Sequence, residues 1–253
     1  LKMSQSRLEV PPNISLGVLQ KLQTLVASVR AFIINQQRRT TVNPELEIRL
    51  GNILEGRFST DVGVKVWTQI ISAMDASSEW SGVMEEKEIV DFFYKGENNK
   101  MLRTSRFIGA QGNIEKEHMF KERQNMCMLI VHGIPYLLNG TRVSFSSETS
   151  IPAEDLPDIT ITEKVRIKYR RSYTWGDWRY DLSKVWTGNT LQAAMRLRDD
   201  QEKSTENATY EVEIECVNSI LFFDKQAHTD EYIALSIALK IIGLLPENIM
   251  LQV

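Results

Sequence analysis

Two stretches of alternating sequence decide the fold: ELEIRLG at residues 45–51 and YEVEIEC at residues 210–216. In both, charged side chains occupy every second position, and apolar side chains lie between them. Side chains at positions i and i+2 leave a β-strand on the same face, so each stretch predicts a strand with one charged and one apolar face. Glu211, Glu213 and Glu215 therefore share a face.

Three further stretches alternate in the same way but carry mainly basic or hydroxyl side chains. They are RVSFSSE at residues 142–148, KVRIKYR at residues 164–170 and RYDLS at residues 179–183. A sheet with one wet and one dry face is common and explains any single strand of this kind. It does not explain why like charges, which repel each other, gather on one strand. Sorting the charges becomes useful if the charged faces all line one cavity.

The whole chain reads mainly as strands with a few helices. Strands are predicted at residues 45–51, 85–95, 101–108, 114–123, 126–132, 141–149, 160–174, 178–186 and 209–217, with turn signals between many of them. Helices are predicted at residues 14–34, 61–75 and 230–243, where apolar residues recur at helical spacing. Asp61 is the predicted N-cap of the second helix, and Asp230 and Gly243 mark the start and end of the third. Nine strands with few helices favour a closed or nearly closed antiparallel sheet.

Composition narrows the class of protein. A chain of 253 residues, 42% hydrophobic and 25% charged, fits one large domain. The net charge of −3 argues against a general duplex-binding protein, which needs many cations. Cys127 and Cys216 are far apart, which favours a reducing compartment over a disulfide scaffold. The most apolar stretches, 126–131 and 233–245, are too short to span a bilayer, so no membrane is expected.

Sorted charges of this kind suit phosphoryl transfer. Acidic strands can hold a hard divalent cation through carboxylate oxygens, and basic strands can hold the phosphates that the cation also touches. Catalysis of phosphoryl transfer is mostly positioning and charge stabilisation. The chain contains neither G-x-x-x-x-G-K-[ST] nor G-x-G-x-x-G, so a P-loop or Rossmann enzyme is disfavoured.

Taken in order, the charged stretches resemble the motifs of the triphosphate tunnel metalloenzymes. Residues 45–51 resemble the first acidic motif of that family, and residues 211–215 resemble its last. Residues 168–173 and 178–185 resemble the basic strand and the R-x-D-x-T strand of fungal and viral RNA triphosphatases, and residues 142–148 resemble the strand with the internal glutamate. Each motif alone is weak, but five in the right order across residues 41–217 are specific. The Arg179-x-Asp181 pair favours the RNA-capping branch. The motif sequences are similar to those of the capping triphosphatase modules of large DNA viruses such as mimivirus.

The resemblance implies an α+β, mainly β fold: an eight-stranded antiparallel β-barrel, the triphosphate tunnel, with a few flanking helices and with Mn2+ or Mg2+ inside. It implies that Glu45, Glu47 and Glu215 ligate the metal and that Glu148 orients the attacking water. The other residues it assigns to catalysis are Lys168, Arg170, Arg179, Asp181, Glu211 and Glu213, and those it assigns to substrate binding are Arg103, Arg166 and Ser183.

Within that set the implied roles differ. Lys168, Arg170 and Arg179 would grip the triphosphate, and Asp181 would orient one of these cations. Arg106 is an alternative to Arg103, and one lysine of the strand at 114–123 is a further candidate.

Two residues depart from the family's usual pattern. Arg49 stands where the cyclase and thiamine-triphosphatase branch has Lys, which supports the capping branch and leaves the role of Arg49 open. Ser183 stands where Thr is usual and keeps the hydroxyl. Trp175, Trp178 and Trp186 are expected to pack on the outside of the barrel.

The expected activity is hydrolysis of the γ-phosphate of triphosphate-ended RNA, the first step of mRNA capping, with nucleoside triphosphate hydrolysis as a side activity. The alternatives are a general polyphosphate or thiamine triphosphate hydrolase and a non-catalytic phosphate-binding module. Since the chain lacks K-x-D-G, guanylyltransferase and methyltransferase modules are expected on a longer parent chain, of which residues 1–253 are the N-terminal domain, or on a partner. The expected location is the host cytoplasm, in the viral factory or virion.

Overall fold

The computed structural model describes residues 16–36, 43–95, 101–109, 112–131, 140–156 and 162–243, and the side chains of 35–36, 43 and 123–131 are outside this description. Parts of three predicted elements, residues 14–15, 132 and 160–161, lie outside the described residues.

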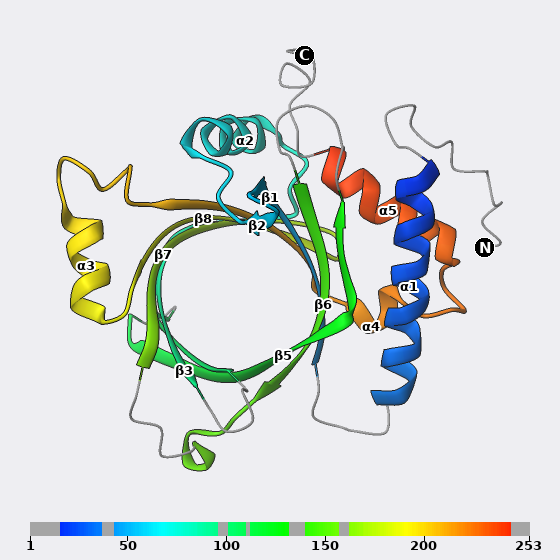
Figure 1. Cartoon of the computed structure of the whole chain (residues 1–253), viewed down its shortest axis with the longest axis horizontal. Helices are drawn as coiled ribbons and strands as arrows, with labels where there is room; N and C mark the ends of the chain where they lie inside the picture. Colours follow the sequence, from blue (N-terminus) through cyan, green and yellow to red (C-terminus); the bar gives the residue numbers. More distant parts are fainter. Residues whose placement is uncertain are drawn as a thin grey trace.

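Eight antiparallel strands close into a barrel, which Figure 1 shows end-on. Around the barrel, their order is β1, β6, β5, β4, β3, β7, β8 and β9, and β9 pairs back to β1. The strands are β1 (Asn43–Leu54), β3 (Gly82–Lys95), β4 (Met101–Ile108), β5 (Ile114–Val131), β6 (Gly140–Ser150), β7 (Thr162–Trp175), β8 (Trp178–Gly188) and β9 (Thr209–Cys216). A short strand, β2 (Arg57–Ser59), folds back on the end of β1. The predicted eight-stranded barrel is confirmed.

The strand predictions were wrong at two places. The strands predicted at 114–123 and 126–132 form one long strand, β5, whose pairing with β6 is irregular between Arg123 and Met128. The irregularity lies at the break that the sequence suggested, but it does not end the strand. The short strand β2 was not predicted.

The barrel is charged inside and apolar outside. On β1, the side chains of Leu46, Ile48 and Leu50 are at most 1% exposed and face the surrounding helices. The alternate residues, beginning with Glu45 and Glu47, point to the interior. The hydrophobic core therefore lies between the barrel wall and its helices, and the bore is left to polar side chains.

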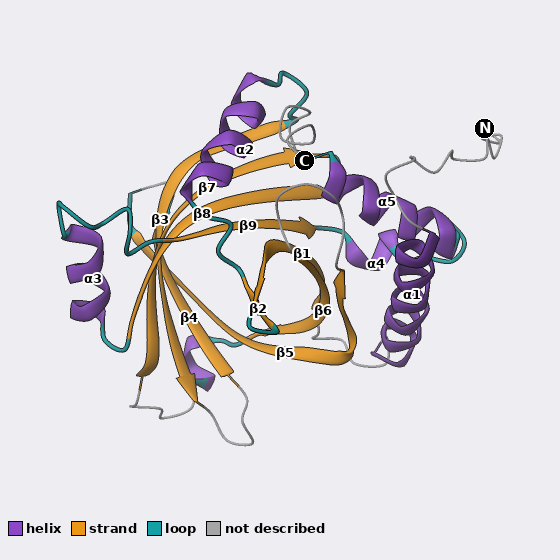
Figure 2. Cartoon of the chain, turned by 45° about the horizontal axis from the view of Figure 1, so that its top comes forward, coloured by secondary structure: helices purple, strands orange, loops and turns teal. Residues whose placement is uncertain are grey.

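Helices cover three parts of the outer wall (Figures 1 and 2). They are α1 (Leu16–Gln36), α2 (Val64–Ala76), α3 (Leu191–Asp199), α4 (Ser219–Phe222) and α5 (Asp230–Ile242), with a 3-10 turn at Ala153–Asp155. α1, α4 and α5 gather beside β1, β5 and β6, where Phe145 stacks edge-on against Phe32 at 5.5 Å. The Arg30 side chain ties this group together, since its Nε donates to the Phe223 carbonyl at 2.9 Å and its guanidinium pairs with Asp230.

The helix predictions hold for three helices, with one error in a cap. α5 begins at Asp230 after the Thr229 cap and ends before Gly243, as predicted. α2 begins after Gly63, not Asp61. The Asp61 carboxylate instead accepts from the backbone N–H groups of Gly63 and Tyr210, both at 3.0 Å, so it fastens the start of α2 to β9. α3 and α4 were not predicted.

By length and composition alone, one described helix could cross a membrane: residues Leu16–Ile34, with a mean hydropathy of 1.2. The apolar stretches considered from the sequence did not include it. In the structure its Leu22, Val26 and Val29 side chains are fully buried, as in a helix that covers a protein core. Core helices of this kind meet the same criterion, and in the structure α1 covers the barrel.

Trp178 and Trp186 pack on the outer wall as predicted, with 5% and 4% of their surface exposed. Trp175 is 47% exposed and lies under the Lys240 ammonium, 3.6 Å from the ring centre.

Candidate active site

The inward side chains surround a cavity of about 500 Å³. Strand alternation positions them, because each strand sends every second residue inward. The lining includes the predicted residues Glu45, Glu47, Arg103, Glu148, Lys168, Arg170, Arg179, Asp181, Glu213 and Glu215, and also Arg49, Asp91, Ser105 and Lys121.

Three neighbouring strands, β9, β1 and β6, form the acidic wall, whose carboxylates are Glu45, Glu47, Glu148, Glu211, Glu213 and Glu215. Glu47 lies directly opposite Glu215 across the β1–β9 ladder, and Arg49 lies opposite Glu213. The three candidate metal ligands therefore come from two adjacent strands.

The cations of the cavity come mainly from the other strands. The basic wall consists of Lys121 on β5, Arg103 on β4, Lys168 and Arg170 on β7, and Arg179 on β8. Arg103 lines the cavity, whereas Arg106 is exposed and lies over the Phe92 ring at 4.5 Å. The sequence left open which of these two arginines faces the tunnel, and in the structure it is Arg103.

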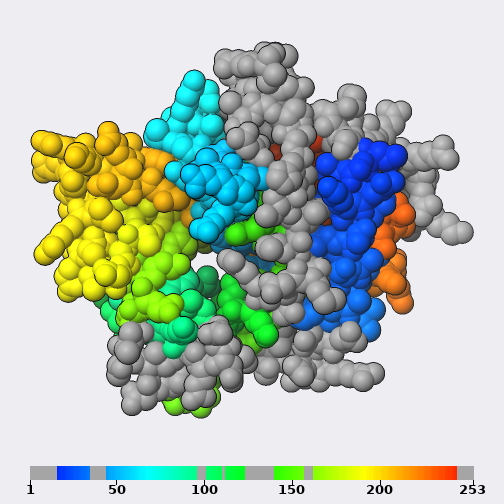
Figure 3. Space-filling model, viewed as in Figure 1, coloured from blue at the N-terminus to red at the C-terminus, as the bar shows by residue number. Residues whose placement is uncertain are grey.

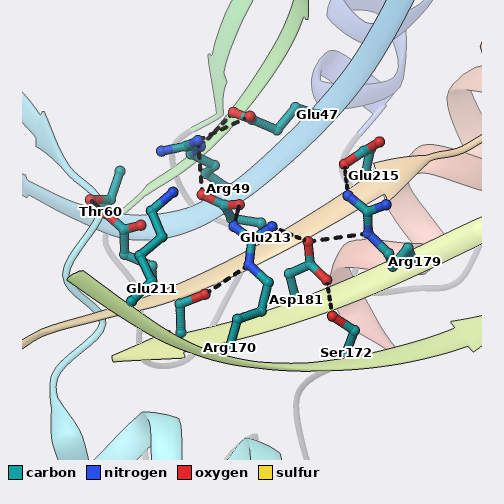
Figure 4. Close-up of polar contacts among 12 residues, drawn as sticks. Glu47, Arg49, Thr60, Arg170, Ser172, Arg179, Asp181, Glu211, Glu213 and Glu215 are labelled. Atoms are coloured by element: carbon teal, nitrogen blue, oxygen red, sulfur yellow. Dashed lines mark hydrogen bonds and ion pairs between the residues drawn. The ribbon is translucent and has the colours of Figure 1, made fainter. Parts of the chain in front are cut away.

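Asp181 joins two arginines of the basic wall (Figure 4). Its Oδ2 lies 2.9 Å from Arg170 Nη1 and 3.2 Å from Arg179 Nε. The two arginines also reach the acidic wall: Arg170 Nη2 lies 3.1 Å from Glu213 and Arg179 Nη2 lies 2.5 Å from Glu215. Each guanidinium is thereby fixed at two points, which favours a fixed direction for its remaining donors.

Lys168 has a partner that sequence reasoning missed. Its Nζ lies 2.5 Å from Asp91 Oδ2, and the Ser105 hydroxyl donates to Asp91 Oδ1 at 2.7 Å. Asp91 is only 2% exposed. The available signal was a single carboxylate between the apolar residues Val90 and Phe92 of a predicted strand, a position where a charge needs a buried partner.

The candidate metal ligands are each paired with a cation of the chain. Glu45 accepts from the Lys121 ammonium and from the Ser146 hydroxyl, the latter at 2.9 Å. Glu47 Oε1 lies 2.5 Å from Arg49 Nε, and Lys121 Nζ lies 3.3 Å from both Glu47 and Glu148. In the described part of the chain, no three side chains of ligand type stand ready to hold an ion. Lys121 is thus the lysine of this strand that enters the tunnel.

Burial and these partners move several pKa values. Burial raises the pKa of Glu215 to about 7 and also raises the pKa of Glu45. Burial alone would raise the pKa of Glu47, but Arg49 and Lys121 outweigh it and lower that pKa to about 2. Burial, assisted by Arg166 and Arg170, lowers the pKa of Lys168 to about 8 despite the neighbouring Asp91.

Three predicted residues are not part of the cavity lining. Arg166 Nη2 lies 2.6 Å from Glu211 Oε1. The same oxygen accepts from the Thr60 hydroxyl at 2.8 Å, and Figure 4 shows Thr60 and Glu211 side by side. Ser183 is fully buried and accepts from Arg170 Nε at 3.2 Å. None of these lines the cavity, so they are placed to support other side chains.

Comparisons with known proteins agree with this geometry. A family model described as mRNA capping enzyme, beta chain, matches residues 72–237. The 5′ RNA triphosphatase A449R of Paramecium bursaria Chlorella virus 1 is 28% identical over 183 residues, which are 72% of this chain and 79% of that protein.

Two solved structures are similar in fold. The Pct1 RNA triphosphatase of S. pombe, in complex with the Spt5 CTD, superposes with a TM-score of 0.62 at 15% identity, covering 99% of this chain and 98% of that one. The RNA triphosphatase domain of a trifunctional mimivirus mRNA capping enzyme superposes with a TM-score of 0.57 at 14% identity, covering 87% and 96%. At these identities the likeness concerns the fold.

Proposed function

Because this chain belongs to the family of mRNA capping enzyme beta chains, we propose that it is a metal-dependent RNA 5′-triphosphatase. Water would attack the γ-phosphorus at the RNA end and the bond to the β–γ bridging oxygen would break, giving diphosphate-ended RNA and inorganic phosphate. The observation that carries the proposal is the tunnel, in which an acidic and a basic wall enclose one cavity of about 500 Å³. The name of the viral relative, a 5′ RNA triphosphatase, supports it.

The acidic wall fits a hard divalent cation. Glu45 and Glu47 leave the same face of β1, and Glu47 lies opposite Glu215. Carboxylate-only ligands suit magnesium or manganese. We therefore propose that these three residues hold Mn2+ or Mg2+, which when bound would neutralise phosphate oxygens and polarise the γ-phosphate.

We propose that Glu148 orients the attacking water. Its Oε1 is buried and receives no hydrogen bond from the described residues, although Lys121 Nζ lies 3.3 Å away as an ion-pair partner. A buried carboxylate oxygen with free acceptor capacity can take a hydrogen bond from water and later its proton.

The basic wall would hold the triphosphate. Lys168, Arg170 and Arg179 would contact the phosphates, with Arg103 as a further ligand beside Glu148, 3.8 Å from its Oε1. Asp181 and Glu213 would orient these cations through the ion pairs described above. Donors fixed in advance stabilise developing phosphate charge without reorganisation. Arg166, Ser183 and Glu211, which do not line the cavity, would act through their neighbours.

The test is phosphate release from γ-labelled triphosphate-ended RNA, with manganese, with magnesium and with chelator. Glu45→Ala and Glu215→Ala should each lose metal-dependent release. Glu88→Ala is the matched control, because Glu88 sits on β3 and pairs with Arg198 outside the tunnel at 3.1 Å. It should keep wild-type release.

Release that survives loss of both carboxylates would place the activity elsewhere. No release from RNA or from nucleotides with any metal would contradict the enzyme proposal and favour a phosphate-binding module. A panel of nucleoside triphosphates, thiamine triphosphate and polyphosphate in the same assay separates a capping enzyme with a side activity from a general triphosphate hydrolase.

The later capping steps need other modules. We propose that residues 1–253 form a single triphosphatase domain that works with guanylyltransferase and methyltransferase modules, on a longer polypeptide or a partner, in the cytoplasm of an infected cell. The similarity to a viral relative supports this setting. Co-purification of guanylyltransferase activity with the protein from infected cells would test it.

A further inference from the structure

The tunnel has two mouths, and one is narrowed by the β1–β2 hairpin. We call the end at Glu45 and Glu215 the front mouth and the end at β2 the back mouth. At the back mouth, Gly51 continues the inward series of β1 and lies opposite Gly140 of β6. A Cβ on Gly51 would meet the Ser59 carbonyl at 2.0 Å and the Phe58 ring at 2.7 Å. Phe58 and Ser59 therefore stand where an inward side chain would otherwise project.

Further contacts fasten the back mouth. A Cβ on Gly140 would lie 3.6 Å from the Phe58 ring, and the Arg142 guanidinium lies 5.0 Å from the centre of that ring. Thr60, just after β2, donates to Glu211. The cavity lining stops short of all these residues. Figure 3 shows the hairpin in light blue at the rim of the bore.

The front mouth is hollow instead. A second cavity of about 530 Å³ adjoins the tunnel there and shares Glu45, Glu148 and Glu215 with it. Its outer lining is Pro44 and residues 216–221. Within that lining Ile220 and Leu221 of α4 are 50% and 66% exposed. The carboxylates of the candidate metal site thus open onto a lip on which the apolar Ile220 and Leu221 stand beside the polar Asn218 and Ser219.

Resting on the proposed function, we propose that this front hollow holds the 5′-terminal nucleoside of the substrate, so that the triphosphate enters the tunnel from the front. Because the hollow shares Glu45, Glu148 and Glu215 with the tunnel, it lies next to the place where the metal would touch the phosphates. The nucleoside, which follows the triphosphate in the substrate, would then lie in the hollow. Apolar side chains with a few polar groups are the usual lining for a base and sugar. The other side of the front mouth carries the exposed Glu115 and Glu117, which repel RNA phosphates and direct the chain toward α4.

The test compares two ligands that share phosphates and differ in the nucleoside: β,γ-methylene-GTP and inorganic tripolyphosphate. Dissociation constants are measured with Mn2+ for the wild type, Leu221→Ser and the double variant Ile220→Ser/Leu221→Ser. Both variants should fold normally, because the substituted side chains are exposed. They should weaken binding of the GTP analogue about five- to tenfold and leave tripolyphosphate binding unchanged. Leu54→Ser is the matched control, since Leu54 is 59% exposed at the back mouth, and it should change neither constant.

Equal losses for both ligands, or no loss for either, would overturn the nucleoside site. A selective loss in Leu54→Ser would overturn the entry from the front. These outcomes are separate from failure of the proposed function, which is absence of phosphate release from triphosphate-ended RNA by the wild type, because the binding constants need no turnover.

Discussion

The acidic and basic walls of the tunnel are built differently. The acidic wall occupies three adjacent strands, β9, β1 and β6, and its Glu47 and Glu215 lie directly opposite each other. The cations of the basic wall are spread over β5, β4, β7 and β8. Ligands of one small ion must converge, whereas ligands of an extended anion must surround it. The difference in spacing matches those two tasks.

The walls also differ in the ion pairs that neutralise their charges. Every candidate metal ligand is paired with a lysine or arginine of the chain. The single side chain of Lys121 contacts three carboxylates, those of Glu45, Glu47 and Glu148. In the basic wall, Arg170 is held by Asp181 and Glu213, and Arg179 is held by Asp181 and Glu215; both keep donors free for a ligand. Each prediction below changes one member of a wall or one of its partners.

The largest effect is expected from Arg170→Ala. Arg170 connects Asp181 to Glu213. Without it, Asp181 keeps only Arg179 as a cationic partner, and Glu213 keeps only Arg49, 2.8 Å away. Because each carboxylate keeps one cation, the loss of unfolding free energy should be that of a charged hydrogen bond, ~1.5–3 kcal/mol. Losing a fixed phosphate ligand should lower kcat about 10²-fold or more. Urea unfolding and phosphate release measure the two effects.

Arg171→Ala is the matched control for that change. Arg171 is the next residue on β7, faces outward and pairs with Asp75 at 2.7 Å with a third of its side chain exposed. It should change kcat little. A loss of kcat as large as that of Arg170→Ala would mean that the barrel wall as a whole, not the inward cation, carries the effect.

A smaller effect is expected from Lys121→Met, which should strengthen metal binding although it removes a cation of the tunnel. A divalent cation must displace the Lys121 ammonium from Glu45 before it can bind. Without that competitor, Mn2+ affinity measured by calorimetry should rise about tenfold or more, ~1.4 kcal/mol per tenfold. Without metal, the thermal midpoint should fall, because three carboxylates lose their shared cation.

Lys87→Met is the control for Lys121→Met. Lys87 also lines the cavity, but its ammonium lies 3.7 Å from the centre of the Phe107 ring. It should leave Mn2+ affinity nearly unchanged. If Lys121→Met weakens Mn2+ binding, Lys121 assists the metal and does not compete with it.

Most of the barrel could be predicted from the sequence, because strand alternation is a local signal. The period of two at 45–51 and 210–216 fixed which residues point inward, and closure followed from the number of strands. What failed depended on tertiary contacts. The short strand β2 exists because Gly51 and Gly140 leave room for Phe58, and no local pattern shows that. α3 had a local signal in Thr190, whose side chain caps it, but the preceding Gly188–Asn189 pair predicts a turn and not a helix.

Site residues were predicted where charges repeat and missed where they stand alone. Most of the repeated glutamates and basic residues of β1, β7 and β9 line the cavity, but Arg166 and Glu211, which pair with each other, are not part of the lining. Asp91 went unnoticed because its partner Lys168 lies 77 positions away in sequence, so only the barrel brings them together. The roles of all these residues stay predictions until the variants are measured.

A moderate effect of pH on phosphate affinity is expected from the titration of Lys168. Burial lowers the pKa of this lysine to about 8, and phosphate binding favours the ammonium form. As pH rises through about 8, the free protein loses this positive charge, so affinity for tripolyphosphate should fall. Lys168→Arg keeps the charge over this range and should remove that fall. Binding constants from pH 6.5 to 9.5, an interval set by the shifted and usual lysine pKa values, measure the change. An identical decline in both proteins would assign it to another group.

The smallest effect is expected from Thr60→Val, which tests where the acidic wall ends. The Thr60 hydroxyl donates to Glu211 Oε1, but Arg166 continues to pair with the same carboxylate at 2.6 Å. Losing one such hydrogen bond costs ~0.5–1.5 kcal/mol of unfolding free energy. Since Glu211 lies outside the cavity lining, tripolyphosphate affinity should stay the same. An affinity loss beyond the stability loss would show that Glu211 acts on the bound phosphates, and the working part of the acidic wall would then extend to the back mouth.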